Sequence, residues 1–161
     1  MKINALYGHL KKCNNQVSTD TRKVIKGSIF FALKGKNFDG NDYALEALKN
    51  GAAYCVVDNE SVSKLDQRIF LVDNVLETLQ KLSTYNRDKS KCYVIALTGS
   101  NGKTTTKELM YHILKTKYDV VCTIGNLNNH IGVPLSLLKI KESTEFAVIE
   151  MGANNFGEIE F

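Results

Sequence analysis

The 161-residue sequence lacks the features that mark secreted, membrane-spanning and zinc-binding proteins. Its four cysteines lie far apart, and no Cys-x-x-Cys pair or Cys/His cluster supplies the spacing of a zinc site. The first residues contain no apolar stretch long enough for a secretory signal, and no run approaches the ~20 apolar residues of a membrane-spanning helix. Internal repeats and low-complexity tracts are also missing. We therefore expect a soluble, cytoplasmic chain.

Charge and hydrophobicity are those of an ordinary globular protein. The formal net charge of +4 is modest and the lysines are scattered, which argues against a nucleic-acid-binding face and suits a protein that handles phosphorylated ligands. Hydrophobic residues make up 43% of the chain, enough for a core. Cys55 and Cys92 lie within apolar runs, which indicates small core residues rather than disulfide partners.

A glycine turn between an apolar run and a helical pattern is the most informative motif. Residues 93–106 read Tyr-Val-Ile-Ala-Leu-Thr-Gly-Ser-Asn-Gly-Lys-Thr-Thr-Thr. Backbone amides of such a turn and of the helix N-terminus point at an anion, and Lys103 adds a full charge. The strict phosphate-loop pattern has a further glycine where this chain has Leu97, so the string alone is weak. Its strand–loop–helix context favours phosphate binding over a glycine turn with an incidental lysine.

Strands and helices alternate along the chain, which predicts an α/β fold with parallel sheets. A polar break at 88–91 suggests two units, a small α/β domain at 1–88 and the start of a P-loop domain at 89–161. Strands are expected at 29–33, 54–57, 69–72, 94–97, 120–124 and 146–150. Helices are expected at 3–12, 43–49, 74–87 (capped by Asp73 or Asn74), 131–138 (with the only proline, Pro134, in its first turn) and from 103 onward.

Three polar segments would meet at the carboxyl edge of the second sheet, where ligands of parallel sheets gather. These segments are 99–104, 125–129 and 150–154. Lys103 suits the β- and γ-phosphates of a nucleoside triphosphate, and Thr104 offers a hydroxyl to Mg²⁺. Glu150 is a candidate second ligand of that metal, because Mg²⁺ prefers carboxylate and water oxygens. The alternative for Glu150 is an exposed carboxylate at the end of a strand.

Other polar turns leave their roles open. Asn128 and Asn129 are equally turn formers or hydrogen-bond donors to a ligand, and His130 is assigned no catalytic role. In the first unit, Asp20-Thr-Arg22 reads as a turn in which the arginine pairs with the aspartate, and residues 35–40 read as a polar turn after a strand. Either could instead cradle a phosphate or a nucleobase.

Taken together, four motifs resemble the Mur ligase family. Thr98-Gly-Ser-Asn-Gly-Lys-Thr-Thr105 is similar to the ATP loop of that family, which also lacks the leading glycine. Two stretches resemble the branch that adds D-alanyl-D-alanine: Gly125-Asn-Leu-Asn-Asn-His-Ile-Gly-Val-Pro-Leu135 and Glu150-Met-Gly-Ala-Asn154. The fourth motif resembles the UDP-substrate domain of the family and comprises Ser18-Thr-Asp-Thr-Arg22, Gly27-Ser-Ile-Phe-Phe-Ala-Leu-Lys-Gly35 and Phe38-Asp-Gly40.

The resemblance implies an ATP-dependent ligase that joins D-alanyl-D-alanine to UDP-N-acetylmuramoyl-tripeptide in peptidoglycan precursor synthesis. ATP would phosphorylate the substrate carboxylate, and the dipeptide amine would displace phosphate from the acyl phosphate. By position, Lys103 and Glu150 would be catalytic, and Thr104 and Glu150 would hold Mg²⁺. The implied nucleotide-binding residues are Thr98, Gly99, Ser100, Asn101, Gly102, Lys103, Thr104 and Thr105. The implied substrate contacts are Thr19, Thr21, Lys36, Asn37, Asn128 and Asn129. The resemblance implies no nucleic acid, no membrane insertion and a monomer.

Alternatives come from inside and outside this family. The MurE-type branch adds the third peptide residue, but the Asn-Asn-x-Ile-Gly-x-Pro stretch and Glu-Met-Gly-Ala argue against it. Folylpolyglutamate synthetase shares the loop but should lack the Asp-Thr-Arg domain. A non-catalytic module that binds UDP precursors is the alternative of a different class. Because family enzymes have three domains and the second unit has few strands, we expect an N-terminal piece of a longer protein. Alone it should be inactive, with an exposed sheet edge and apolar faces.

Overall fold

The computed structural model describes residues 1–152 and divides into two compact units. Unit 1 comprises residues 1–82 and unit 2 begins at Ser83, so the boundary lies inside α4 (Val75–Lys89). The sequence predicts the boundary a few residues later, between 88 and 89, at the end of this helix. Asn74 caps this helix as expected, because its Oδ1 accepts a hydrogen bond of 2.9 Å from the Glu77 backbone N–H. No helix of residues 1–152 is both long and apolar enough to cross a membrane.

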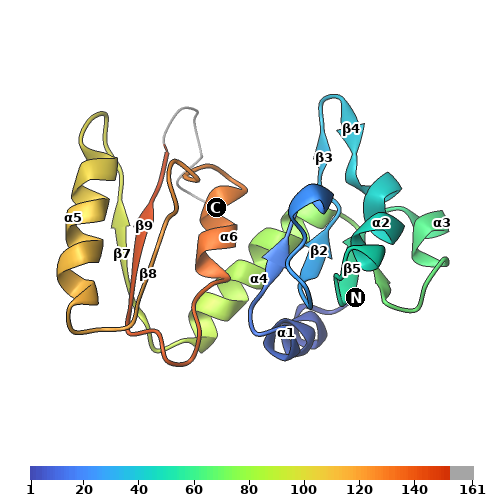
Figure 1. The fold of residues 1–161 in the computed structure, drawn as a ribbon, viewed down its shortest axis with the longest axis horizontal. Helices are drawn as coiled ribbons and strands as arrows, with labels where there is room; N and C mark the ends of the chain where they lie inside the picture. The colour runs from blue at the N-terminus through green and yellow to red at the C-terminus, as the bar shows by residue number, and fades with distance from the viewer. Residues whose placement is uncertain (153–161) are drawn as a thin grey trace. The chain divides into compact units, whose positions relative to one another are not determined.

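Unit 1 is built on a four-stranded parallel sheet with the order β1-β2-β5-β6 (Figure 1). Its helices before α4 are α1 (Ile3–Lys12), α2 (Ala44–Lys49) and α3 (Glu60–Ser63), with 3-10 turns at Thr21–Lys23 and Gly40–Tyr43. Its strands are β1 (Val17–Ser18), β2 (Ile29–Phe31), β3 (Lys34–Gly35), β4 (Phe38–Asp39), β5 (Tyr54–Val57) and β6 (Ile69–Leu71). The sequence predicts β2, β5, β6, α1 and α2, but neither β1 nor α3.

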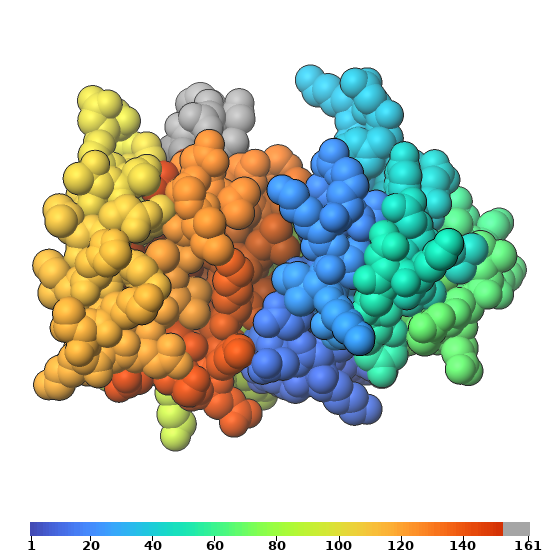
Figure 2. Space-filling view, in the orientation of Figure 1, coloured from blue at the N-terminus to red at the C-terminus, as the bar shows by residue number. Residues whose placement is uncertain are grey.

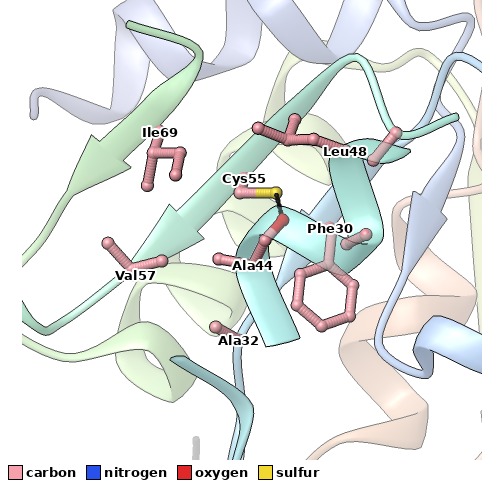
Figure 3. Close-up of a cluster of buried hydrophobic side chains, with 9 residues drawn as sticks. Phe30, Ala32, Ala44, Leu48, Cys55, Val57 and Ile69 are labelled. Carbon is pink, nitrogen blue, oxygen red and sulfur yellow. Dashed lines mark hydrogen bonds between the residues drawn. The ribbon is translucent and has the colours of Figure 1, made fainter. Parts of the chain in front are cut away.

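Small and aliphatic side chains of α2 close one face of this sheet. Figure 3 shows Ala44 and Leu48 of α2 packed with Phe30, Cys55 and Val57 of the central strands. The Cys55 Sγ donates a hydrogen bond of 3.3 Å to the Ala44 carbonyl oxygen. Burial raises the pKa of the Cys55 thiol to about 12. Cys55 is therefore an unreactive core residue, as its apolar run predicts.

A short antiparallel hairpin, β3–β4, replaces the polar turn that the sequence predicts at residues 35–40. Each strand has two residues, too few to show a periodicity. The buried Asn41 anchors the hairpin to the end of β5, because its Nδ2 donates to Asp39 Oδ1 over 2.6 Å and to Asp58 Oδ1 over 2.8 Å. In the space-filling view of Figure 2 the hairpin, in light blue, stands out from the surface of unit 1.

Unit 2 contains a three-stranded parallel sheet with the order β7-β9-β8. Its elements after α4 are β7 (Tyr93–Leu97), α5 (Lys103–Lys115), β8 (Val120–Cys122), α6 (Gly132–Leu137) and β9 (Phe146–Glu150). All five are predicted, although the strand expected to reach Ile124 ends at Cys122. The predicted α/β class with parallel sheets is confirmed.

Apolar side chains remain exposed on β7 and α5. Tyr93 at the start of β7 is 72% exposed, and Leu109 and Ile113 on α5 are 60% and 69% exposed. Within the described residues β7 is also an edge strand, since it pairs with β9 alone. The structure thus confirms the expected edge and apolar faces in unit 2.

Candidate functional site

The predicted phosphate loop connects β7 to α5. Gly99 and Gly102 have φ angles of 139° and 78°, which residues with a side chain rarely adopt, and the space beside both glycines is open. Gly102 directly precedes α5, so the unpaired amides of the first helical turn face the loop. The Lys103 Nζ donates a hydrogen bond back to the Gly99 carbonyl oxygen, across the mouth of the loop. The local geometry is that of an anion site.

Glu150, at the end of β9, is the centre of the polar cluster beside this loop. It is 1% exposed, so the alternative of an exposed strand-end carboxylate is wrong. Its carboxylate accepts hydrogen bonds from Thr104 Oγ1 over 2.9 Å and from Asn128 Nδ2 over 2.8 Å. Its backbone N–H donates to Thr123 Oγ1 over 3.0 Å. A buried carboxylate held by donors on two other segments has a fixed position.

Backbone hydrogen bonds join the three strand ends that carry these side chains. The Met151 N–H donates to the Leu97 carbonyl over 2.8 Å, which connects β9 to the start of the phosphate loop. The Gly152 N–H donates to the Asn128 carbonyl over 2.7 Å, which connects β9 to the loop after β8. The predicted meeting of three segments at one sheet edge is confirmed for residues 99–104, 125–129 and 150–152. Ala153 and Asn154 lie outside the described residues.

Lys107 belongs to the same cluster, and sequence reasoning missed it. Its side chain is 0% exposed, and its Nζ donates to the Gly125 carbonyl oxygen over 3.0 Å. The same Nζ lies 3.0 Å from Glu108 Oε1 and 4.0 Å from Glu150 Oε2. The only signal in the sequence is its position one helical turn after Lys103, which is equally typical of a solvated helix face.

The donor set fits a magnesium ion bound together with phosphates. Within the described residues no group of three or more His, Cys, Asp or Glu side chains could hold a metal ion. Mg²⁺ takes one or two protein oxygens and fills its other positions from phosphate and water. Thr104 and Glu150, adjacent at the mouth of the loop, supply oxygens of that kind.

Asn129 and His130 follow Asn128 in the chain but have different surroundings. The Asn129 Oδ1 accepts hydrogen bonds from the backbone N–H groups of Ile131 and Gly132, over 3.1 and 2.9 Å. Asn129 is therefore a turn former just before α6, one of the two roles that its sequence allows. His130 is exposed.

Unit 1 contains a pocket of its own, with a volume of about 450 Å³. Its lining residues are Thr19, Asp20, Thr21, Arg22, Phe30, Phe38, Gly40, Tyr43 and Glu46. Of the four substrate contacts predicted in unit 1, Thr19 and Thr21 therefore share one pocket. The other two, Lys36 and Asn37, form the exposed tip of the β3–β4 hairpin and are not among the lining residues.

An arginine–aspartate pair forms part of the wall of this pocket. The Arg22 Nε and Nη2 donate to the two carboxylate oxygens of Asp20 over 2.9 and 2.7 Å, which confirms the predicted pairing. These side-chain hydrogen bonds, with one from the Arg22 backbone, lower the pKa of Asp20 to about 2. The Arg22 side chain is 84% exposed and has further N–H groups besides those that bind Asp20. Phe38 and Tyr43, both partly exposed, add two aromatic faces.

Two models of one protein family match most of the chain. Residues 15–87 match the model described as Mur ligase family, catalytic domain, and residues 97–161 match the Mur ligase middle domain. The chain belongs to the Mur ligase family. The phosphate loop without the leading glycine lies within the second match, as the resemblance predicts.

Curated relatives in the Mur ligase family share one name. The UDP-N-acetylmuramoyl-tripeptide–D-alanyl-D-alanine ligases of Bacillus subtilis (strain 168) and Escherichia coli (strain K12) are both 43% identical to this chain, over 145 and 143 residues. Each match covers 89% of this chain but only 32% and 31% of the relative. The chain thus spans about a third of the length of these curated relatives.

Solved structures of Mur ligases confirm the fold. MurF from Acinetobacter baumannii is similar with a TM-score of 0.79 and 38% identity, covering 90% of this chain and 32% of that one. The MurF ligase from Thermotoga maritima in complex with ADP gives a TM-score of 0.78 and 40% identity, covering 91% of this chain and 34% of that one.

Proposed function

We propose that this chain supplies the UDP-substrate and phosphate sites of an ATP-dependent ligase that joins D-alanyl-D-alanine to UDP-N-acetylmuramoyl-tripeptide in the cytoplasm. The observation that carries the proposal is the junction of Thr104, Asn128 and Glu150 at the mouth of the phosphate loop. The shared name of the relatives supports the choice of reaction. Unit 1 would bind the uridine diphosphate end, and unit 2 would bind ATP.

The chemistry proposed for unit 2 is phosphoryl transfer followed by acyl transfer. The loop amides from Gly99 to Thr105 and the Lys103 ammonium would hold the β- and γ-phosphates of ATP. Thr104 and Glu150 would hold Mg²⁺, which neutralises charge on the phosphoryl group. The substrate carboxylate oxygen would bond to the γ-phosphorus as the bond to ADP breaks. The dipeptide amine would then attack the acyl carbon, lose a proton and release inorganic phosphate.

The chemistry proposed for unit 1 is recognition of a nucleoside diphosphate. The Thr19 and Thr21 hydroxyls and the outward N–H groups of Arg22 suit phosphate oxygens, and Phe38 or Tyr43 offers a face on which uracil can stack. Lys36 and Asn37, at the tip of the hairpin, would reach a ligand that extends beyond the pocket. Asn128 would lie toward the muramoyl peptide, and Asn129 would contribute through the turn it forms.

Calorimetric titration of the chain tests both sites separately. UDP-N-acetylmuramoyl-tripeptide should bind with saturation and more tightly than UMP, and ADP with Mg²⁺ should bind to unit 2. Lys103→Met should weaken ADP binding at least tenfold without changing precursor binding, and Lys115→Met, an exposed lysine on the same helix, is the matched control. Precursor binding without any nucleotide binding would favour the non-catalytic module instead. Binding of neither ligand by a folded chain would refute the proposal.

A further inference from the structure

Lys107 is a buried lysine next to the phosphate loop, and no step of the proposed function uses it. Lys107 occupies the second turn of α5 and is 0% exposed, whereas Lys103 and Thr104 in the first turn reach the mouth of the loop. Lysine is almost never fully buried unless its ammonium is paired. Its burial here needs an explanation beyond the helical pattern.

The Lys107 ammonium makes one hydrogen bond and lies near two carboxylates, on three segments of the chain. One contact is the Gly125 carbonyl, 3.0 Å away in the loop after β8. A second is Glu108 Oε1, 3.0 Å away on α5 itself, and a third is Glu150 Oε2, 4.0 Å away at the end of β9. The half-exposed Glu108 carboxylate can be solvated without Lys107. Glu150 is 1% exposed, so its carboxylate depends most on this ammonium.

The contacts of Lys107 with Gly125 and Glu150 both bear on Asn128. Gly125 begins the loop that carries Asn128, and Asn128 donates to the same Glu150 carboxylate that Lys107 attracts. The Thr104 hydroxyl donates over 2.9 Å to Glu150 Oε2, the oxygen that Lys107 also approaches, whereas Asn128 donates to Oε1. Lys107 thus holds both the carboxylate and the loop that orients it.

We propose that Lys107 is a positioning residue of the metal and phosphate site, which fixes the Glu150 carboxylate and the Gly125 loop beside Thr104. This inference rests on the proposed nucleotide site. Mg²⁺ demands near-ideal octahedral geometry, so a carboxylate that is displaced by a fraction of an ångström binds it less well. Phosphate binding by the loop amides and Lys103 does not pass through Lys107.

Mn²⁺, which prefers the same oxygen ligands, is a suitable probe because its free form can be counted by electron paramagnetic resonance. Lys107→Met removes the charge and keeps the length of the side chain, Lys107→Arg keeps the charge, and Lys115→Met is the matched control on the surface of α5. At saturating ADP, Lys107→Met should weaken Mn²⁺ binding at least tenfold while metal-free ADP affinity stays within twofold. Lys107→Arg should weaken Mn²⁺ binding less, and Lys115→Met should leave it unchanged.

Unchanged or tighter Mn²⁺ binding by Lys107→Met would overturn the inference. A loss of metal-free ADP affinity as large as the loss of Mn²⁺ affinity would overturn it as well, because it indicates a purely structural role. Amide hydrogen exchange of residues 125–129 in the metal-free chain is an independent reading. It should be faster in Lys107→Met than in Lys115→Met, and equal rates would also overturn the inference. A parent chain that binds no ADP would refute the proposed function. The hydrogen-exchange rates of residues 125–129 would then be the only test of whether Lys107 fixes the Gly125 loop.

Discussion

Asn128→Asp should destabilise the sheet of unit 2, because it replaces a hydrogen-bond donor by a second carboxylate beside Glu150. The Asn128 Nδ2 now donates to Glu150 Oε1 over 2.8 Å. The substitution conserves size and shape, so charge and donor capacity change while packing does not. Asn129→Asp is the matched control. It adds the same charge one residue further on, where the Asn129 Oδ1 accepts from the amides of Ile131 and Gly132 and an aspartate oxygen can do the same.

The expected cost follows from the distance between the two carboxylates. At the 2.8 Å of the present hydrogen bond and an effective dielectric constant of about 20, two unit charges repel by about 6 kcal/mol. Asn128 is half-buried, so solvent screens part of this repulsion and the two groups can move apart. Loss of a hydrogen bond to a charged group adds about 1.5 kcal/mol, and the nearby Lys107 ammonium offsets some of the sum. We expect a net cost of about 3 kcal/mol for Asn128→Asp and below about 0.5 kcal/mol for Asn129→Asp.

Amide hydrogen exchange of β9 measures this cost locally, which suits a chain whose two units need not unfold together. A loss of about 3 kcal/mol corresponds to exchange about a hundredfold faster in residues 146–150 of Asn128→Asp. The β2 and β5 amides of unit 1 serve as the internal reference. The reasoning is refuted if the two aspartate variants exchange equally fast, or if Asn128→Asp differs from the parent by less than about threefold.

Three further outcomes can be checked. Gly40→Ala should lower the melting temperature, since its Cβ would lie 2.4 Å from the Leu33 carbonyl oxygen. Gly8→Ala, whose Cβ meets open space in α1, should instead raise the free energy of unfolding by about 0.5–1 kcal/mol. Side-chain hydrogen bonds from Arg68 lower the pKa of Asp66 to about 2, so their stabilisation holds above pH 3.8 and is lost as pH falls through 2. Arg68→Met should return the pKa of Asp66, followed by NMR, toward 3.8. The chain alone should release no phosphate from ATP with both substrates in a coupled assay, and sustained release would contradict this.

The elements that the sequence predicts are those with a strong local signal. The helix after the phosphate loop starts at Lys103 because Gly102 adopts a positive φ directly before it, and the Asn74 side chain fixes the start of α4. Continuous apolar runs predict β2, β5, β7 and β9, and their alternation with helices predicts parallel pairing. The phosphate loop itself is readable because its chemistry resides in backbone amides and one lysine.

The elements that the sequence misses are set by contacts between distant residues. β1 has two residues, which pair with Ile29 and Phe30 of β2, so no periodicity marks it. The β3–β4 hairpin has a polar turn composition, and its form depends on Asn41 bridging to Asp58 at the end of β5. Such a long-range hydrogen bond leaves no trace in the local pattern of the sequence.

The polar cluster of unit 2 shows the same limit at the level of single side chains. Lys107 and Glu108 read as charges of a solvated helix face, yet the Gly125 loop and the end of β9 cover one of them and leave the other half-exposed. Which of the two side chains is buried depends on the face of α5 that meets Glu150. The order β7-β9-β8 sets that face, and helical spacing does not. A carboxylate already buried there attracts a cation from the covering helix, since neither charge is stable alone in that place. The burial of Glu150 and the burial of Lys107 therefore depend on each other.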